Sequence, residues 1–178
     1  MKIVFISDIH GSFGYAKLIP EILKRENAEK LVILGDLYYH GPRNPLPLEY
    51  SPMEVSHLLN SLEVDKVAVR GNCDAEVDIK ITDFDVLDTF EFKCGKNKVF
   101  CSHGQNFNID KFPECEFDIM IYGHKHTGFI VEKHGKIIAN AGSISLPKDG
   151  TKNSYLVLTE ENLQLKELDG NKIDEKSF

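Results

Sequence analysis

Apolar runs alternate with helical segments in the first part of this chain, and this alternation constrains the fold more than any other feature. Residues 2–7 (KIVFIS), 30–34 (KLVIL) and 66–69 (KVAV) are nearly continuous apolar runs, typical of strands buried on both faces. The segments between them, residues 12–27 and 52–62, carry apolar residues at helical spacing. This strand–helix–strand–helix–strand order predicts a parallel sheet with right-handed crossovers.

Both helical segments contain residues that mark helix starts. Ser12 is expected to cap the first helix, and Pro52 occupies a first-turn position in the second. Pro20 lies inside the first segment, where we expect it either to bend the helix or to delay its start.

The second half of the chain consists mainly of strand-like segments. Hairpin turns are expected at His134-Gly135 and Glu161-Asn162. The predicted strands are residues 85–92, 98–102, 119–122, 128–133, 136–139, 154–159 and 163–168. No internal repeat or linker separates the two halves, so we expect one α/β domain over residues 1–178. Its two sheets are expected to pack face to face as a β-sandwich, with helices outside.

The charge of the chain excludes one class of partner. The formal net charge is -7, and the 21 Lys and Arg residues are scattered along the sequence. A protein that grips long nucleic acid usually presents a basic face, because phosphate neutralisation supplies most of the affinity. We therefore expect no long nucleic acid as a partner, and we expect any phosphate ester handled here to be small.

The sequence also predicts a cytoplasmic location without membrane contact. The apolar run at the N-terminus is interrupted by Asp8, which leaves it too short for a signal peptide or a membrane span. The four cysteines, Cys73, Cys94, Cys101 and Cys115, form no Cys-x-x-Cys pair or dense framework. Such cysteines are typical of reduced thiols in a reducing compartment.

Residues that can bind metal ions follow each predicted strand of the first half. They are Asp8 and His10 after the first strand, Asp36 after the second and Asn72 after the third. Ligands bind beyond the carboxyl ends of the strands in open α/β sheets, so these side chains are expected to meet. Two later strands are followed by His103 and by Gly123-His124-Lys125-His126. Glycine beside such residues allows tight turns and a close approach of the backbone to an ion.

Seven oxygen and nitrogen donors are more than one divalent ion needs, and they suit two. The Asp-x-His and His-x-His spacings place alternate residues on one side of an extended segment. A single Asp or His at a strand end is usually an ordinary loop residue, and we assign His57 and His134 to that class while leaving His40 open. Five strand ends are not expected to finish in such residues by accident. The predicted metal ligands are Asp8, His10, Asp36, Asn72, His103, His124 and His126.

The ordered set Asp-x-His, Gly-Asp, Gly-Asn, His and Gly-His-x-His resembles the calcineurin-like metallophosphoesterase superfamily. Four longer stretches resemble its YfcE-type bacterial phosphodiesterase branch: residues 7–11 (SDIHG), 31–36 (LVILGD), 40–44 (HGPRN) and 69–74 (VRGNCD). The likeness covers nearly the whole chain. It implies a metallophosphoesterase-like fold, a two-sheet β-sandwich flanked by helices in four layers, α/β/β/α. It also implies a metal-dependent phosphoric diester hydrolase.

The resemblance further implies two divalent metal ions per chain. Asp8, His10 and His126 would hold the first ion, Asn72, His103 and His124 the second, and Asp36 would bridge them. A metal-bridging hydroxide would be the nucleophile, because cation binding lowers the pKa of water. Manganese is the ion expected first, with zinc, iron or nickel as alternatives.

The residues expected to take part in catalysis are Asp36, Asn72, His103 and Arg43. Arg43 is a candidate phosphate clamp because a guanidinium fork matches phosphate oxygens, and a solvated loop charge is the alternative interpretation. Protein phosphatases of the superfamily have a proton-donating His where this chain has Cys73, and an Asp and Arg where it has Tyr39 and His40. This difference is evidence against protein phosphatase activity and agrees with the YfcE-type branch.

Three functions therefore remain open at this point. The first is hydrolysis of small phosphodiesters, the second is a phosphomonoesterase or nucleotidase with the same metal site, and the third is a non-catalytic metallophosphoesterase-like binding module. The loops at residues 37–51 and 74–84 are expected to select the substrate. The aromatic and proline residues of the first loop, together with the resemblance, predict a homo-oligomer, either a dimer or a tetramer.

Overall fold

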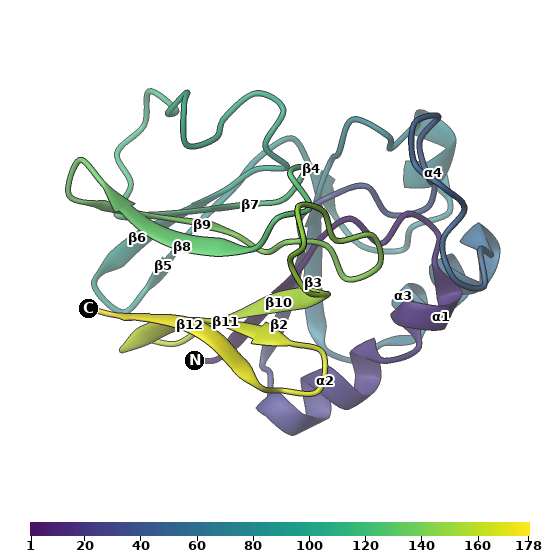
Figure 1. Ribbon diagram of the computed structural model, residues 1–178, viewed down its shortest axis with the longest axis horizontal. Helices are drawn as coiled ribbons and strands as arrows, with labels where there is room; N and C mark the ends of the chain where they lie inside the picture. Colours follow the sequence, from purple (N-terminus) through teal and green to yellow (C-terminus); the bar gives the residue numbers. More distant parts are fainter.

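Two β-sheets form the centre of the computed structural model, which describes residues 1–178 (Figure 1). The strands are β1 (Ile3–Ile6), β2 (Lys30–Ile33), β3 (Asp65–Val69), β4 (Val86–Leu87), β5 (Phe90–Cys94), β6 (Asn97–Cys101), β7 (Ile119–Tyr122), β8 (Phe129–Lys133), β9 (Lys136–Asn140), β10 (Ser154–Leu158), β11 (Asn162–Glu167) and β12 (Lys172–Ser177). The helices are α1 (Phe13–Ala16), α2 (Ile19–Glu26), α3 (Pro52–Ser61) and α4 (Glu76–Lys80).

The larger sheet has 7 strands in the order β12-β11-β10-β1-β2-β3-β4, and the smaller has 5 in the order β5-β6-β7-β9-β8. β1, β2 and β3 pair in parallel, as the alternating sequence pattern predicts. In the smaller sheet β6, β7 and β9 are also parallel. The candidate ligands lie in loops at the carboxyl ends of five of these six parallel strands, all except β9.

The two sheets share one apolar core. Buried residues from the larger sheet, such as Phe5 and Val32, pack with Cys101 and Ile121 from the smaller sheet. A second core lies between the larger sheet and the helices, so the expected α/β sandwich is confirmed. The outer face of the smaller sheet is covered by apolar side chains of a loop, including Phe107, rather than by a helix.

The first helical segment is divided in two, as the position of Pro20 explains. α1 ends at Ala16, and Pro20 occupies the first turn of α2, so the proline delays the start of the second helix. Ser12 occupies the N-cap position of α1, but its side chain donates to the carbonyl of Leu48 at 2.7 Å, so the expected capping bond is absent. No helix combines the length and the apolar character needed to cross a membrane.

Three elements differ from the sequence expectations. The strand expected at residues 85–92 is two strands, because the chain leaves the larger sheet after β4 and enters the smaller sheet at β5. The edge strand β12 and the short helix α4 were not expected, since β12 is largely polar and α4 buries no residue. The turn at His134-Gly135 is confirmed, and both residues have the positive φ that such a turn requires.

Candidate metal centre

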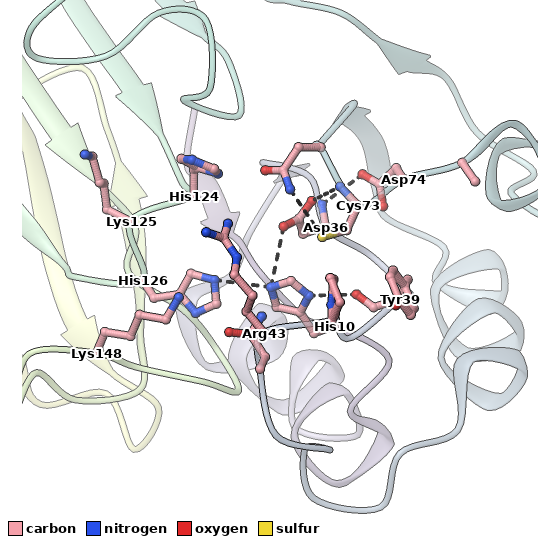
Figure 2. A pocket seen from close by; sticks show the side chains of 15 residues that line it. His10, Asp36, Tyr39, Arg43, Cys73, Asp74, His124, Lys125, His126 and Lys148 are labelled. Carbon is pink, nitrogen blue, oxygen red and sulfur yellow. Dashed lines mark hydrogen bonds and ion pairs between the residues drawn. The ribbon is translucent and has the colours of Figure 1, made fainter.

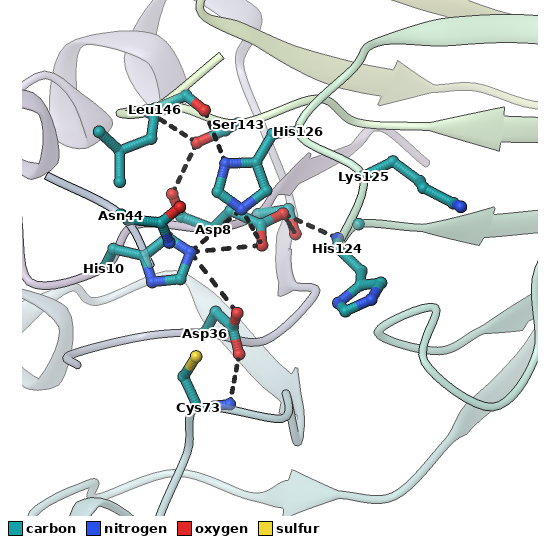
Figure 3. A network of polar contacts seen from close by, with 12 residues as sticks. Asp8, His10, Asp36, Asn44, Cys73, His124, Lys125, His126, Ser143 and Leu146 are labelled. Carbon is teal, nitrogen blue, oxygen red and sulfur yellow. Dashed lines mark hydrogen bonds and ion pairs between the residues drawn. The ribbon is translucent and has the colours of Figure 1, made fainter. Parts of the chain in front are cut away.

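All predicted metal ligands lie together at the carboxyl ends of the parallel strands, where the two sheets meet. Figures 2 and 3 label five of them, Asp8, His10, Asp36, His124 and His126. Strands of both sheets therefore supply the site, which explains why the donors are spread over most of the sequence. They follow β1 (Asp8, His10), β2 (Asp36), β3 (Asn72), β6 (His103) and β7 (His124, His126).

Asp8, His10 and His126 form a buried cluster whose ligand atoms lie within 4.8 Å of one another. His126 Nε2 is 3.3 Å from Asp8 Oδ1 and 3.2 Å from His10 Nε2. The Nδ1 atoms of both rings face backbone carbonyls, at 2.7 Å to Tyr39 and 2.6 Å to Leu146. Donation from Nδ1 to a carbonyl leaves the Nε2 lone pair free, as a metal ligand requires.

A second cluster forms around His103. Its Nε2 atom is 3.2 Å from Asn72 Oδ1, 3.2 Å from His124 Nδ1 and 3.4 Å from Asp36 Oδ2. Its Nδ1 atom lies 2.6 Å from the carbonyl of Leu34, so this ring is oriented in the same way as those of the first cluster. The four side chains could hold a second ion.

Asp36 lies between the two clusters. Its Oδ2 atom is 3.5 Å from His10 Nε2 and 3.4 Å from His103 Nε2, while Oδ1 accepts a hydrogen bond from the backbone N–H of Cys73 at 2.8 Å (Figure 3). A carboxylate in this position could bind two ions at once.

The chemistry of these donors fits a cation. Asp8 Oδ2 accepts hydrogen bonds from Ser7 Oγ at 2.6 Å and from the backbone N–H of His124 at 2.9 Å. Asp8 Oδ1 is buried without a hydrogen-bond partner, although it faces the Nε2 atoms of His126 and His10 at 3.3 and 3.7 Å. Acceptor atoms that face one another in a dry site require a positive charge between them. The residues therefore fit a divalent metal ion.

The titration of the cluster agrees with this interpretation. Burial alone would lower the pKa of His103, but Asp36 and Asp8 raise it to about 9, so a proton supplies the positive charge when no ion is bound. Burial lowers the pKa of His10 and of His124, which favours the neutral imidazole that binds metal. Burial opposes ionisation of Asp36, but His103 holds the pKa of this carboxyl well below its usual value.

The backbone at the site is strained. Five of the predicted ligands have φ in the left-handed region: Asp8 at 55°, His10 at 52°, Asp36 at 56°, His124 at 67° and His126 at 59°. This conformation is uncommon for residues other than glycine, and it concentrates at functional sites. It turns each side chain sharply from its strand into the site, a feature that strand-end spacing alone does not indicate.

Asp74 supports the ligand loops and was not identified as a site residue from the sequence. Its carboxylate accepts backbone hydrogen bonds from Asp36 at 2.8 Å, Leu37 at 2.7 Å and Gly71 at 2.7 Å. It therefore ties the loop after β2 to the loop after β3. Burial raises the pKa of Asp74 to about 6. Its position in VRGNCD, two residues after Asn72, is the signal that could have indicated this role.

Ser143 and Ser145 support the loop after β1. Both hydroxyls donate to the backbone carbonyl of Asp8 at 2.8 Å (Figure 3 draws the Ser143 bond). Asn140, the last residue of β9, donates to the carbonyl of Gly123 at 2.6 Å and so holds the loop after β7. These bonds fix the positions of the backbone from which the ligands project.

A cavity of about 810 Å³ is lined by five of the seven donors, all except Asp8 and His103 (Figure 2). Arg43 lines it and is exposed, a position open both to a phosphate clamp and to a solvated loop charge. Cys73 also lines it, and burial together with Asp36 raises the pKa of this thiol to about 12. His40 is not in the lining, because its ring packs edge-on against Tyr39 and Tyr50 with centroids 4.9 and 5.2 Å away.

The fold and the donor set define a metallophosphoesterase domain. The calcineurin-like phosphoesterase superfamily domain matches residues 1–163, and the chain belongs to this superfamily. Membership implies divalent metal ions, and the donor groups described above fit them.

Among known proteins, the chain is similar to phosphodiesterase YfcE of Escherichia coli strain K12. The two are 39% identical over 168 residues, which are 93% of this chain and 91% of YfcE. The solved structure of YfcE, a phosphoesterase from E. coli, matches with a TM-score of 0.95 at 36% identity and covers 99% of both chains. The probable metallophosphoesterase YsnB of Bacillus subtilis strain 168 is 28% identical over 170 residues, which are 91% of this chain and 86% of YsnB.

Proposed function

We propose that this protein is a metal-dependent phosphodiesterase that hydrolyses small phosphodiesters. The observation that carries the proposal is the position of Asp36, whose Oδ2 atom lies 3.5 Å from His10 Nε2 in one donor cluster and 3.4 Å from His103 Nε2 in the other. The likeness to YfcE, a phosphodiesterase of similar length, supports the same reaction.

We assign the donors to two ions. Asp8, His10 and His126 would hold one, Asn72, His103 and His124 would hold the other, and Asp36 would be shared between them; the distances within each cluster support this division. Two bound divalent ions would clamp the attacking and leaving oxygens of an in-line displacement at phosphorus. Oxygen and nitrogen donors without a thiolate agree with manganese as the native ion.

The chain's own residues orient the reaction. The carbonyl contacts of His10, His103 and His126 fix the direction of each Nε2 atom, and the hydrogen bond from Cys73 fixes the Asp36 carboxylate. Arg43 lies in the loop at residues 37–51 and lines the cavity. From there its guanidinium holds a non-bridging phosphoryl oxygen of the substrate.

Two further properties belong to this proposal. A cytoplasmic location is supported by four free thiols. A dimer or tetramer is supported by the exposed apolar side chains of Leu46, Leu48 and Met53, which are 66%, 56% and 50% accessible and lie close together in the sequence.

Phosphomonoester hydrolysis is the second candidate, because the cationic lining of the cavity would also suit a dianionic monoester. Kinetics with bis(p-nitrophenyl) phosphate and p-nitrophenyl phosphate separate the two, since both release the same leaving group. We expect the manganese-loaded protein to have a higher kcat/KM for the diester, a chelator to abolish both activities, and Asp36→Asn to lower both. Asp85→Asn, at an exposed carboxylate outside the cavity and outside the loop at residues 74–84, is the matched control. A preference for the monoester, or activity that survives the chelator, would overturn the proposal.

A further inference from the structure

Three cationic side chains line the cavity, and the protein leaves all of them without a partner. They are Arg43, Lys125 and Lys148, and none forms an ion pair or a side-chain hydrogen bond within the chain. Some lysines elsewhere are paired, such as Lys17 with Glu49 at 2.9 Å, and others, such as Lys24, are unpaired. What distinguishes these three cations is that they line one cavity. The cavity thus collects free positive charge in a chain whose net charge is -7.

The carboxylates that line the cavity do not neutralise these cations. Asp36 faces His10 and His103, and Asp74 accepts three backbone hydrogen bonds. Both groups are buried, so their charge is directed at the donor clusters and the ligand loops. The accessible part of the cavity is therefore electropositive, a field that attracts anionic ligands.

This positive charge exceeds what a simple diester needs. Two divalent ions would bring four positive charges, and the carboxylates of Asp8 and Asp36 together with the hydroxide nucleophile would cancel three of them. A diester phosphate carries a single negative charge, so the metal centre alone balances it. The additional cations match negative charge elsewhere on the substrate.

Lys125 and Lys148 are well placed to receive that charge. Lys125 stands between the donors His124 and His126, and the backbone N–H of Lys148 donates to the carbonyl of His126 at 3.0 Å. Figure 2 shows both lysines on the side of the cavity formed by His126, while Arg43 extends from a separate loop. The backbone thus anchors both lysines next to a donor residue, on the lining of a cavity large enough for a nucleotide-sized molecule. Figure 2 draws Lys125 extending away from His126, and the flexible stems of both lysines allow their ammonium groups to reach an anion in the cavity.

We propose that Lys125 and Lys148 form a subsite for a second anionic group, so that the substrate is a phosphodiester with an additional phosphate or carboxylate on one of its ester groups. This inference rests on the proposed phosphodiesterase function and names its substrate class. Arg43 acts on the scissile phosphate, and the two lysines act on the remote charge.

Two chromogenic diesters that differ by one phosphate test the proposal. They are thymidine 5′-(p-nitrophenyl phosphate) with a free 3′-hydroxyl and the same molecule with a 3′-phosphate. We expect the manganese-loaded protein to prefer the 3′-phosphorylated diester by about three- to tenfold in kcat/KM, mainly through KM, as two exposed charge pairs would give. The preference should fall as ionic strength rises.

The double variant Lys125→Gln/Lys148→Gln should bring the ratio of the two kcat/KM values close to one. Lys152→Gln, an exposed lysine outside the cavity lining, should keep the parent ratio. A ratio of one in the parent, or a ratio that the double variant does not change, would overturn the subsite and leave the phosphodiesterase function standing.

If neither diester is hydrolysed, the proposed function itself fails. Binding of the two expected products then still tests the subsite. Calorimetry then compares thymidine 3′,5′-bisphosphate with thymidine 5′-phosphate on the manganese-loaded protein. Tighter binding of the bisphosphate that is lost in the double variant supports the subsite. Equal binding of the two nucleotides refutes it.

Discussion

Replacing Gly71 with alanine tests why glycine precedes Asn72. From the sequence, glycine was expected here so that the backbone could approach an ion. The structure gives a different reason: an alanine Cβ at this position would lie 2.2 Å from Asp36 Oδ1 and 2.4 Å from the Asp36 backbone N. The φ of Gly71 is outside the left-handed region, so the conflict is steric rather than conformational.

The expected effect follows from these distances. Cβ atoms essentially never approach within 3.0 Å, so the Asp36 carboxylate must move by at least about 0.8 Å. A displacement of this size would disturb the distances of 3.4 and 3.5 Å that separate Asp36 Oδ2 from the Nε2 atoms of His103 and His10. A misplacement of ~1 Å at a catalytic site can cost about 10²-fold in rate. We therefore expect Gly71→Ala to lower kcat/KM for bis(p-nitrophenyl) phosphate by about 100-fold and to weaken manganese binding.

Gly150→Ala provides the control, because an added Cβ there meets no atom within 4 Å. Its φ of +73° means that alanine costs backbone strain, about 1 kcal/mol of stability, without touching the site. Initial rates, manganese titration and urea denaturation should be measured for both variants. Gly71→Ala with activity within threefold of the parent, or the same loss of activity in Gly150→Ala, would refute the steric argument.

Three further predictions concern stability, chemistry and assembly. Tyr155 and Lys166 hydrogen-bond to buried Glu26 and, against the effect of burial, hold its pKa below the usual 4.5. The contribution of ionised Glu26 to stability is therefore complete above that pH and lost as pH falls through the lower pKa of the folded state. Glu26→Gln should lower the free energy of unfolding at pH 7 by about 1–3 kcal/mol and weaken the loss of stability at acid pH. Urea titrations at several pH values would show both effects. Cys73 occupies the position of the proton-donating His of the superfamily's protein phosphatases, and a thiol is a poor substitute for that imidazole. Rates should therefore depend steeply on the leaving group, and Cys73→His should recover part of the ~10²–10⁴-fold that a general acid contributes. A flat leaving-group series in the parent would contradict this. Light scattering should show a dimer or tetramer, and a single 20.2 kDa species at micromolar concentration would contradict the assembly.

The parallel core of the fold could be predicted from the sequence because its strands are buried on both faces and therefore apolar throughout. β1, β2 and β3 all lie within one residue or two of the expected runs. β12 could not be predicted in this way, since a polar edge strand has no apolar pattern and is defined only by its pairing with β11. The break between β4 and β5 depends on the packing of two sheets, which local sequence does not encode.

The donors of the site could be predicted because metal binding requires particular residue types at strand ends, and those types are visible in the sequence. The residues that position them could not, because their roles depend on distant contacts. Asp74 acts through three backbone N–H groups, and Ser145 acts through the carbonyl of Asp8, 137 residues away. Lys148 contacts the His126 backbone only because the loop after β9 returns to the site.

The stoichiometry of metal binding tests the central claim most directly. Protein stripped with a chelator and titrated with manganese should bind close to two equivalents per chain by elemental analysis. Asp36→Asn should bind less manganese and lose most of its diesterase activity, because the bridging carboxylate is gone. Saturation of the parent at one equivalent, together with an Asp36→Asn variant that remains fully active, would contradict a dinuclear phosphodiesterase.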